Sequence, residues 1–321
     1  MLDFSLSAAS SNIDLSLVFD LVIIGAGPAG LTSAIYCSRY RLKTLLIEKK
    51  FVCGGQMATI NSLENYPGFS EPVQGSRITK EMENQALEAG TQIIQVQVDS
   101  VNFSGVIKEL TTSKGIVKSR AVIIATGAVP RMLGVPGEKD YIGKGVSYCA
   151  TCDGHLYIDK TIAVVGGGNT ALEEAITLTK YAKKIFLIHR RQGFRADKII
   201  QEKIRTIPKI ELVLDTIVKK INFKDTKNKK ILIATKGKEK ALEVDGIFIF
   251  VGTIPNSELI TDALELENGF IKTGPDMKTN IEGVFAAGDI RLKSLRQVAT
   301  AVGDGATAGY SANSYLTNKN V

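Results

Sequence analysis

Residues 19–40 read FDLVIIGAGPAGLTSAIYCSRY. The stretch starts as an apolar run with β-branched residues, turns through three glycines in six residues, and continues with residues typical of a helix. This is the G-x-G-x-x-G pattern in a strand–turn–helix context, which binds the pyrophosphate of a dinucleotide. Gly25 allows the tight turn, Gly27 lets the backbone approach the pyrophosphate, and Gly30 lets helix and strand pack closely. The segment therefore predicts a Rossmann-like domain whose helix N-terminus faces the phosphates.

An acidic residue follows this first fingerprint at the expected distance. A second apolar strand, KTLLIEKK, ends near Glu48, which lies 18 residues beyond Gly30. An acid at about this spacing binds a ribose hydroxyl in dinucleotide-binding domains. The combination predicts a first site for FAD or NAD, and the alternative is a plain strand–helix turn.

The glycine pattern recurs at residues 161–175, TIAVVGGGNTALEEA. Gly166, Gly168 and Ala171 again join an apolar strand to a helix, but the next strand ends in basic residues instead of an acid. These residues are His189, Arg190, Arg191 and Arg195. Because the planar fork of arginine suits a 2′-phosphate, the second site is predicted to prefer NADPH to NADH. The alternative is that these arginines are ordinary surface charges.

The two fingerprints divide the chain. The strands AVIIATGAVP (121–130) and GIFIFVGTIPN (246–256) close the two units, and the segment after residue 256 begins no new fingerprint. We therefore expect an α/β fold of two Rossmann-like dinucleotide-binding domains, each with a three-layer parallel sheet, the second inserted in the first. The predicted boundaries are 1–18 for a polar lead-in, 19–128 and 256–321 for the FAD-binding domain, and 131–253 for the NADPH-binding domain.

Two cysteines lie close together in residues 147–155, SYCATCDGH. A zinc site would need four ligands, and the chain has four cysteines and two histidines in all, several of them inside other motifs. A structural disulfide would close a very short loop and stabilise little. The pattern therefore favours redox work by Cys149 and Cys152, with no metal. Asp153 is interpreted as the local acid–base group, and a helix N-cap is an alternative role that can hold as well.

The composition is typical of a globular protein, with 44% hydrophobic and 23% charged residues. No apolar run approaches the roughly 20 residues that a membrane span requires, and residues 1–20 carry no basic targeting region. We therefore expect a cytoplasmic protein without a membrane role. The net charge of +7 owes much to the lysine-rich stretch 219–240, which reads as an exposed hairpin and not as a nucleic-acid surface.

With these motifs in hand, the sequence resembles the small bacterial and archaeal type of thioredoxin reductase. The resemblance covers about Phe19 to Leu316. It rests on GAGPAG at 25–30, GGQM at 54–57, ENYPG at 64–68, ATG at 125–127, CATCDG at 149–154, GGGNTA at 166–171, HRRQGFRA at 189–196, and GD with RQVA at 288–299. Departures from the family pattern are Gln192, the extension 1–18, and Cys53 before GGQ.

The resemblance implies FAD and NADPH as cofactors, thioredoxin as the protein substrate, and a homodimer formed mainly by the FAD domain. It implies that Cys152 faces the flavin and that Cys149 attacks the disulfide of the partner. The FAD-binding residues implied are Gly25, Gly27, Pro28, Ala29, Gly30, Glu48, Gly55, Gln56, Asn65, Val98, Ala125, Thr126, Gly127, Gly288, Asp289, Arg296, Gln297 and Val298. The NADPH-binding residues implied are Gly166, Gly168, Asn169, Thr170, Glu173, His189, Arg190, Arg191 and Arg195.

The placement of the cysteine pair carries a further expectation. It lies in the NADPH domain, yet it must meet the flavin and then a bulky protein disulfide. We therefore expect the inserted domain to rotate on its two chain crossings between half-reactions. Two alternatives stay open: a flavoprotein reductase serving a peroxide-scavenging or other small dithiol protein, and a reductase with an electron donor other than NADPH.

Overall fold

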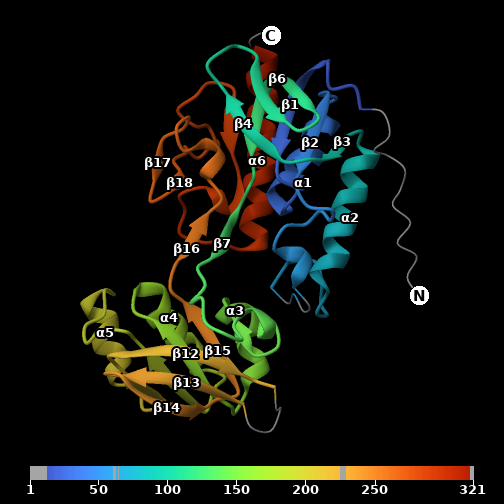
Figure 1. The fold of residues 1–321 in the computed structure, drawn as a ribbon. Helices are drawn as coiled ribbons and strands as arrows, with labels where there is room; N and C mark the ends of the chain where they lie inside the picture. The colour runs from blue at the N-terminus through green and yellow to red at the C-terminus, as the bar shows by residue number, and fades with distance from the viewer. Residues whose placement is uncertain (1–12, 61–62, 64, 225–228, 319–321) are drawn as a thin grey trace. The chain divides into compact units, whose positions relative to one another are not determined.

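The computed structural model describes residues 13–60, 63, 65–224 and 229–318, which form two compact units (Figure 1). The outer unit comprises the residues through Val129 together with those from Pro255, and the inserted unit comprises Pro130–Ile254. The chain passes between them twice. The two passages contain β7 (Ala128–Pro130) and β16 (Thr253–Pro255), which pair as a two-stranded ribbon.

The outer unit is built on a seven-stranded sheet with the order β3-β2-β1-β6-β5-β4, in which β19 also pairs with β6. Its parallel part joins β3, β2, β1, β6 and β19, whereas β5 and β4 are antiparallel. The strands are β1 (Val18–Ile24), β2 (Thr44–Glu48), β3 (Gln92–Gln95), β4 (Val98–Asn102), β5 (Lys108–Thr112), β6 (Gly115–Ile124) and β19 (Val284–Ala286).

The antiparallel edge departs from the wholly parallel sheet that the sequence predicted. Only two residues connect β5 to β6. The residues on either side of this turn, Thr112 and Gly115, pair with each other. A connection this short can only form a hairpin, because a parallel crossover needs a dozen residues or more.

Alternating side chains of the central strands face two different cores. Leu21 and Ile23 of β1 pack in one cluster with residues of α1 (Pro28–Arg39), α2 (Gly75–Glu88) and α6 (Val298–Asn318). Val22 and Ile24 pack on the opposite face, in a cluster that includes residues of η4 (Glu258–Ile260), β18 (Phe270–Ile271) and η5 (Gly288–Ile290). This two-sided burial is typical of a parallel strand covered on both faces. The remaining short elements of this unit are η1 (Met57–Thr59) and β17 (Leu266–Glu267).

The inserted unit has a five-stranded parallel sheet with the order β11-β10-β9-β15-β8. Three helices pack on one face, and the antiparallel sheet β12-β13-β14 packs on the other (Figure 1). The described residues of the lysine-rich stretch, 219–224 and 229–240, contribute to the strands of this second sheet. The elements are η2 (Lys139–Tyr141), β8 (Val146–Ser147), α3 (Ala150–Asp153), η3 (Gly154–Tyr157), β9 (Thr161–Gly166), α4 (Asn169–Leu178), β10 (Lys184–Ile188), α5 (Lys198–Arg205), β11 (Ile210–Val213), β12 (Thr216–Asn222), β13 (Lys230–Thr235), β14 (Lys238–Glu243) and β15 (Gly246–Phe250).

Helices α1 and α6 pack closely because small residues line their contact. A Cβ added to Gly305 would lie 2.3 Å from the carbonyl oxygen of Ala29, so the two backbones touch directly. The hydroxyl of Ser33 donates a hydrogen bond to the carbonyl of Gly305 at 3.0 Å. Within the part of the chain that the structure describes, none of the helices has the length and apolarity that crossing a membrane requires.

Two glycines of α6 provide a matched test of this contact. We expect Gly305→Ala to destabilise the protein by about 1–3 kcal/mol, because the new methyl group has no space. Gly303→Ala is the control, since nothing lies within 4 Å of its added Cβ; alanine there should stabilise the helix by up to about 1 kcal/mol. Thermal unfolding followed by circular dichroism measures both. Equal melting temperatures for the two variants would contradict the packing described.

Candidate functional site

The predicted FAD residues gather where the parallel strands of the outer unit end. Backbone hydrogen bonds continue the sheet beyond its last paired residues: Gly25 N donates to Ile47 O at 2.8 Å and Ala125 N donates to Ile24 O at 2.8 Å. Ala287 N donates to Ile124 O at 2.9 Å. The segments after β1, β2, β6 and β19 are therefore neighbours at one edge, which is where α/β sheets bind ligands.

The glycine turn has both tight and open positions. Gly25 has φ +103°, and a Cβ there would lie 2.5 Å from the Ala125 carbonyl oxygen. A Cβ on Gly30 would lie 1.8 Å from the carbonyl oxygen of Gly25. Gly27 differs, because nothing lies within 4 Å of its added Cβ. It is the N-cap of α1, with no side-chain cap and no acid in the first turn, so this helix N-terminus fits an anionic diphosphate.

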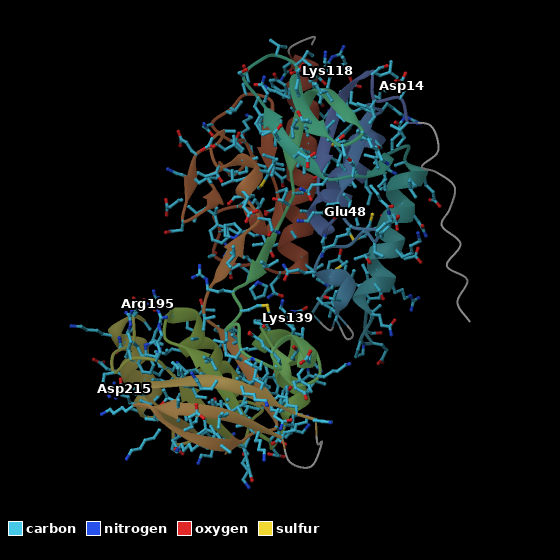
Figure 2. All side chains as sticks on the ribbon, in the orientation of Figure 1. Asp14, Glu48, Lys118, Lys139, Arg195 and Asp215 are labelled. Carbon is cyan, nitrogen blue, oxygen red and sulfur yellow. A yellow bond between two sulfur atoms is a disulfide. The ribbon has the colours of Figure 1, made fainter. Side chains whose placement is uncertain are left out.

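Glu48 lies beside this turn, at the end of β2 (Figure 2). Its side chain is buried, and Oε2 accepts a hydrogen bond from the N–H of Ala26 at 2.8 Å. Oε1 accepts a hydrogen bond from the N–H of Lys50 at 2.9 Å. A carboxylate held in this way keeps further lone pairs for ligand hydroxyls.

The loop residues predicted to hold a flavin lie around the same edge. Gly55 approaches Gly27: a Cβ added to Gly55 would lie 3.2 Å from the Cα of Gly27. Gln56 Nε2 donates a hydrogen bond to the carbonyl of Ala128. Asn65 Nδ2 donates to Gln297 Oε1 at 3.0 Å. Val98 is different, because its side chain is buried in the core at the start of β4. It leaves only main-chain atoms to face a ligand.

Asn256 holds the segment 125–127 in place and was not predicted from the sequence. Its Nδ2 donates to the Thr126 carbonyl at 2.8 Å, and its backbone N–H donates to the Gly127 carbonyl at 2.9 Å. The Thr126 hydroxyl donates to the Asn256 carbonyl at 2.9 Å. The available signal was its position directly after Pro255, where the chain re-enters the outer unit.

Asp289 in η5 has a feature that points to a ligand. Its Oδ1 is the single side-chain atom among the described residues that is buried without a hydrogen-bond partner. Burial raises the pKa of this carboxyl group, while Lys293 and Arg296 act to lower it. Arg296 lies over the ring of Phe270 at 4.1 Å and donates to the carbonyls of Asp289 and Arg291. A buried acceptor that receives no hydrogen bond at this edge fits a hydroxyl-bearing cofactor.

The second glycine turn repeats this geometry in the inserted unit. A Cβ on Gly166 would lie 2.4 Å from the Phe250 carbonyl oxygen, whereas Gly168 has nothing within 4 Å. Gly168 is the N-cap of α4 and has no side-chain cap. Asn169 and Asp197 exchange two hydrogen bonds, with Asn169 Nδ2 donating at 2.9 Å and Asp197 N donating at 2.8 Å. They tie the turn to the segment that carries the arginines.

Three of the four predicted basic residues are exposed beside this turn: Arg190, Arg191 and Arg195. The backbone N–H of Arg195 donates to the Gly167 carbonyl at 2.7 Å, which holds this segment against the glycine turn. Thr170 and Glu173 are exposed on the first turns of α4.

His189 differs from the three arginines in its environment. Its side chain is buried under the turn, where a Cβ on Gly167 would lie 2.1 Å from the imidazole Cε1. Burial lowers the pKa of His189 below its usual value. The ring hydrogen-bonds the Gly193 carbonyl through Nε2 at 3.1 Å. Its role is to support the turn.

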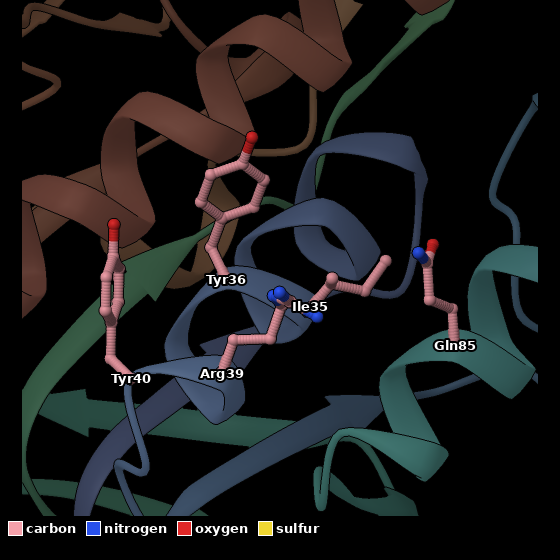
Figure 3. A pocket seen from close by; sticks show the side chains of 5 residues that line it. All are labelled: Ile35, Tyr36, Arg39, Tyr40 and Gln85. Atoms are coloured by element: carbon pink, nitrogen blue, oxygen red, sulfur yellow. The ribbon is translucent and has the colours of Figure 1, made fainter.

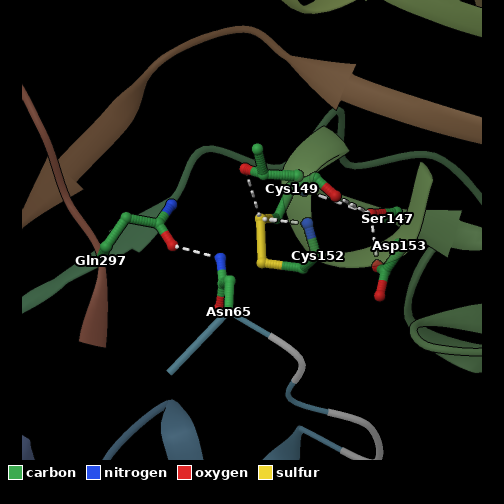
Figure 4. The surroundings of a disulfide bond; sticks show 7 residues. Asn65, Ser147, Cys149, Cys152, Asp153 and Gln297 are labelled. Carbon is green, nitrogen blue, oxygen red and sulfur yellow. Dashed lines mark hydrogen bonds between the residues drawn. A yellow bond between two sulfur atoms is a disulfide. The ribbon is translucent and has the colours of Figure 1, made fainter. Parts of the chain in front are cut away.

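Cys149 and Cys152 form a disulfide in the inserted unit (Figure 4). Both are half-buried at the start of α3, and Cys149 is the N-cap residue of this short helix. Its Sγ accepts the backbone N–H of Cys152 at 3.1 Å. A donor at this distance stabilises negative charge on the sulfur of Cys149.

The structure also shows what Asp153 does in this state. Its Oδ2 accepts a hydrogen bond from the Ser147 hydroxyl at 2.6 Å, and it makes no side-chain N-cap bond (Figure 4). Asp153 thus occupies the N-cap position of η3 without capping that helix through its side chain. Ser147 Oγ also accepts the backbone N–H of Cys149 at 3.1 Å, so one buried hydroxyl links the acid to the cysteine. Ser147 was not predicted from the sequence.

Tyr148, directly before Cys149, is anchored by a buried acid that was also not predicted. Its hydroxyl donates to Glu138 Oε1 at 2.7 Å. The same carboxylate accepts the backbone N–H groups of Leu133, at 2.9 Å, and Gly134, at 2.7 Å. The redox motif is thus tied to the segment that follows the first chain crossing.

The other two cysteines, Cys37 and Cys53, are free and buried. Burial raises the pKa of the Cys53 thiol to about 12, with help from Glu83 and Glu48. Burial likewise raises the pKa of Cys37. Both remain protonated at neutral pH and are poor nucleophiles. In the described part of the chain, no three His, Cys, Asp or Glu side chains gather as metal ligands would.

A shallow hollow of about 340 Å³ lies elsewhere on the outer unit (Figure 3). It is lined by Ile35, Tyr36, Arg39, Tyr40 and Gln85. Four of these belong to the last two turns of α1 and its end. Since α1 runs away from the glycine turn at its N-terminus, the hollow lies far along the helix from the candidate site.

Residues 19–305 match the family described as pyridine nucleotide-disulphide oxidoreductase, and the chain belongs to this family. Its relatives include thioredoxin reductase of Peptoclostridium litorale, which is 45% identical over 309 residues covering 93% of this chain and 97% of the relative. Thioredoxin reductase of Bacillus subtilis (strain 168) is 41% identical over 302 residues, with 93% and 95% covered. The predicted resemblance and the predicted enzyme class are confirmed.

The fold is shared as well. The crystal structure of thioredoxin reductase from Streptococcus pyogenes MGAS5005 matches this structure with a TM-score of 0.88 at 40% identity, covering 94% of this chain and 99% of that one. The predicted α/β fold class with parallel sheets is therefore confirmed.

Proposed function

We propose that this chain is an NADPH-dependent, FAD-containing thioredoxin reductase. The observation that carries the proposal is the Cys149–Cys152 disulfide, held beside Asp153 at a helix start. It belongs to a chain with two glycine turns whose open positions suit two nucleotides. Relatives named thioredoxin reductase, at 41–45% identity over 93% of the chain, support the substrate.

The outer unit is proposed to hold FAD. A bound flavin would supply the exchange of an electron pair between a nicotinamide and a disulfide. The turn at Gly25–Gly30 would bind the diphosphate, and Glu48 would accept a ribose hydroxyl. The unpartnered Oδ1 of Asp289 suits a hydroxyl donor of the cofactor. Gln56 and Asn65 are already hydrogen-bonded to Ala128 and Gln297, which orients both amides.

The inserted unit is proposed to bind NADPH. The turn at Gly166–Gly168 would bind the diphosphate, and Arg190, Arg191 and Arg195 would contact the 2′-phosphate. Their exposure leaves their donors available for an anion. The hydrogen bonds between Asn169 and Asp197 hold this arginine segment against the turn, which reduces the entropy lost on binding.

The chain's own cysteines carry the thiol chemistry. Opening of the Cys149–Cys152 bond takes up two electrons and two protons and yields a dithiol. The Cys149 thiolate then attacks a sulfur of the thioredoxin disulfide, which forms a mixed disulfide and releases the other thioredoxin sulfur as a thiol. Cys152 attacks Cys149 Sγ in this mixed disulfide, and the second thioredoxin thiol leaves. These steps reduce thioredoxin and re-form the original bond. Asp153, oriented by Ser147, is placed to hold and return the proton that the thiols exchange.

Replacement of either cysteine tests this proposal. We expect Cys149→Ser and Cys152→Ser each to lower NADPH-dependent thioredoxin reduction at least about 10³-fold, because one thiol cannot complete the exchange. NADPH-dependent dye reduction should remain near the wild-type rate and serves as the folding control. NADH should support a lower kcat/KM than NADPH with the wild type. Normal thioredoxin reduction by Cys152→Ser would refute the relay.

We further propose that the inserted unit rotates between half-reactions. The disulfide belongs to the inserted unit, whereas the proposed flavin site belongs to the outer unit, and the same cysteines must also reach a protein substrate. The chain passes between the two units twice, at β7 and β16. A covalent cross-link between the units is expected to reduce turnover strongly. Full turnover by the cross-linked protein would rule out the rotation.

We also propose a cytoplasmic homodimer. A reductase that draws on NADPH works where this nucleotide is regenerated, which supports the cytoplasm. Aromatic side chains are enriched at protein interfaces, and Tyr36, Tyr40 and Tyr310 of the outer unit are exposed. Light scattering during gel filtration should give twice the mass of one chain. The mass of a single chain at micromolar concentration would argue against the dimer.

A further inference from the structure

Four charged side chains gather around η5 in the outer unit, two of them buried and two partly buried. Asp304 of α6 and Arg291 are each 9% exposed, and the Lys293 side chain is 12% exposed. Asp289 is the fourth member. Burying charges costs several kcal/mol per ion unless each is paired and hydrogen-bonded. Packing alone therefore does not explain why these charged residues lie together at this place.

Asp304 contacts the chain on both sides of Asp289. Its Oδ2 accepts the backbone N–H of Gly288 at 3.0 Å, directly before Asp289. Its Oδ1 accepts a hydrogen bond from Nη1 of Arg291 at 2.8 Å, and Oδ2 also accepts one from Nζ of Lys293 at 3.0 Å. One carboxylate on α6 thus holds the backbone before Asp289 and two side chains after it.

Lys293 lies between the two acids. Its Nζ is 3.0 Å from Asp304 Oδ2 and 3.4 Å from Asp289 Oδ1. The second distance is that of an ion pair without hydrogen-bond geometry, which is why Asp289 Oδ1 still accepts no hydrogen bond. The ammonium group offsets the repulsion between the two carboxylates. It also acts against the burial that raises the pKa of Asp289.

We propose that Lys293 and Asp304 are positioning residues for the flavin cofactor: they hold Asp289 so that its Oδ1, which accepts no hydrogen bond within the protein, can accept one from a polyol hydroxyl. The chemistry selects this part of the cofactor. A diphosphate has no hydrogen to donate and repels a carboxylate, whereas a hydroxyl of the chain between diphosphate and ring is a donor. The inference rests on the proposed FAD site and deepens it.

The affinity for FAD tests this assignment without an activity assay. The Lys293→Met and Asp304→Asn variants are purified as full-length proteins and then diluted. The fluorescence of the FAD that dissociates on dilution gives the dissociation constant. Each variant is expected to raise the FAD dissociation constant about tenfold or more, because a buried, charge-assisted contact is lost. Lys293→Arg, which keeps the charge, should stay within about threefold of the wild type.

Two controls separate positioning from general damage. Lys278→Met removes an exposed ion pair with Asp276 in the same unit and should leave FAD affinity unchanged. ADP, which lacks the polyol, should compete for the site with the same inhibition constant in the wild type and all variants. Lys293→Gln, which keeps a donor but no charge, covers the case in which the methionine variant does not fold.

The possible outcomes are distinct. Wild-type FAD affinity in both Lys293→Met and Lys293→Gln overturns the inference, and so does an equal loss of ADP affinity in them. A wild-type protein that binds ADP but no FAD overturns the proposed function itself. Selective loss of FAD affinity, with ADP binding and the circular dichroism spectrum retained, supports the assignment.

Discussion

The structure depends on places where one backbone touches another with no side chain between them. A Cβ on Gly30 would meet the carbonyl of Gly25, a Cβ on Gly25 would meet the carbonyl of Ala125, and a Cβ on Gly305 would meet the carbonyl of Ala29. Gly166 has the same relation to Phe250 in the inserted unit. Overpacking by one methyl group costs a kcal/mol or more. Glycine at these positions therefore sets how closely the turn, the next strand and the helices approach.

Two other glycines have free space in front of them, in contrast to the glycines at the close backbone contacts. Gly27 and Gly168 have nothing within 4 Å of an added Cβ, and each caps a helix that has no side-chain cap. The tight positions bring backbone N–H groups to the edge of the sheet, and the open positions leave room in front of them. The binding of two nucleotides on one chain would follow from repeating this single arrangement.

The redox motif is organised in a different way. Ser147, Cys149 and Asp153 are linked by hydrogen bonds within seven residues of chain, and the disulfide closes over three. These contacts lie entirely within the inserted unit, so they do not depend on how that unit is oriented. By contrast, the outer site is assembled by contacts between distant segments: Thr126 with Asn256, and Gly288 with Asp304.

The sequence by itself determined the features that depend on local pattern: the two strand–turn–helix units, the α/β class, and the redox pair, because glycine spacing and CxxC act over a few residues. It did not reveal the antiparallel β4–β5 edge, the burial of His189, the hydrogen bond of Asp153 to Ser147, or the contacts of Asn256 and Asp304. Those were decided by the tertiary structure. Burial lowers the pKa of a histidine, and a hydrogen bond between residues 130 positions apart exists only after the chain has folded.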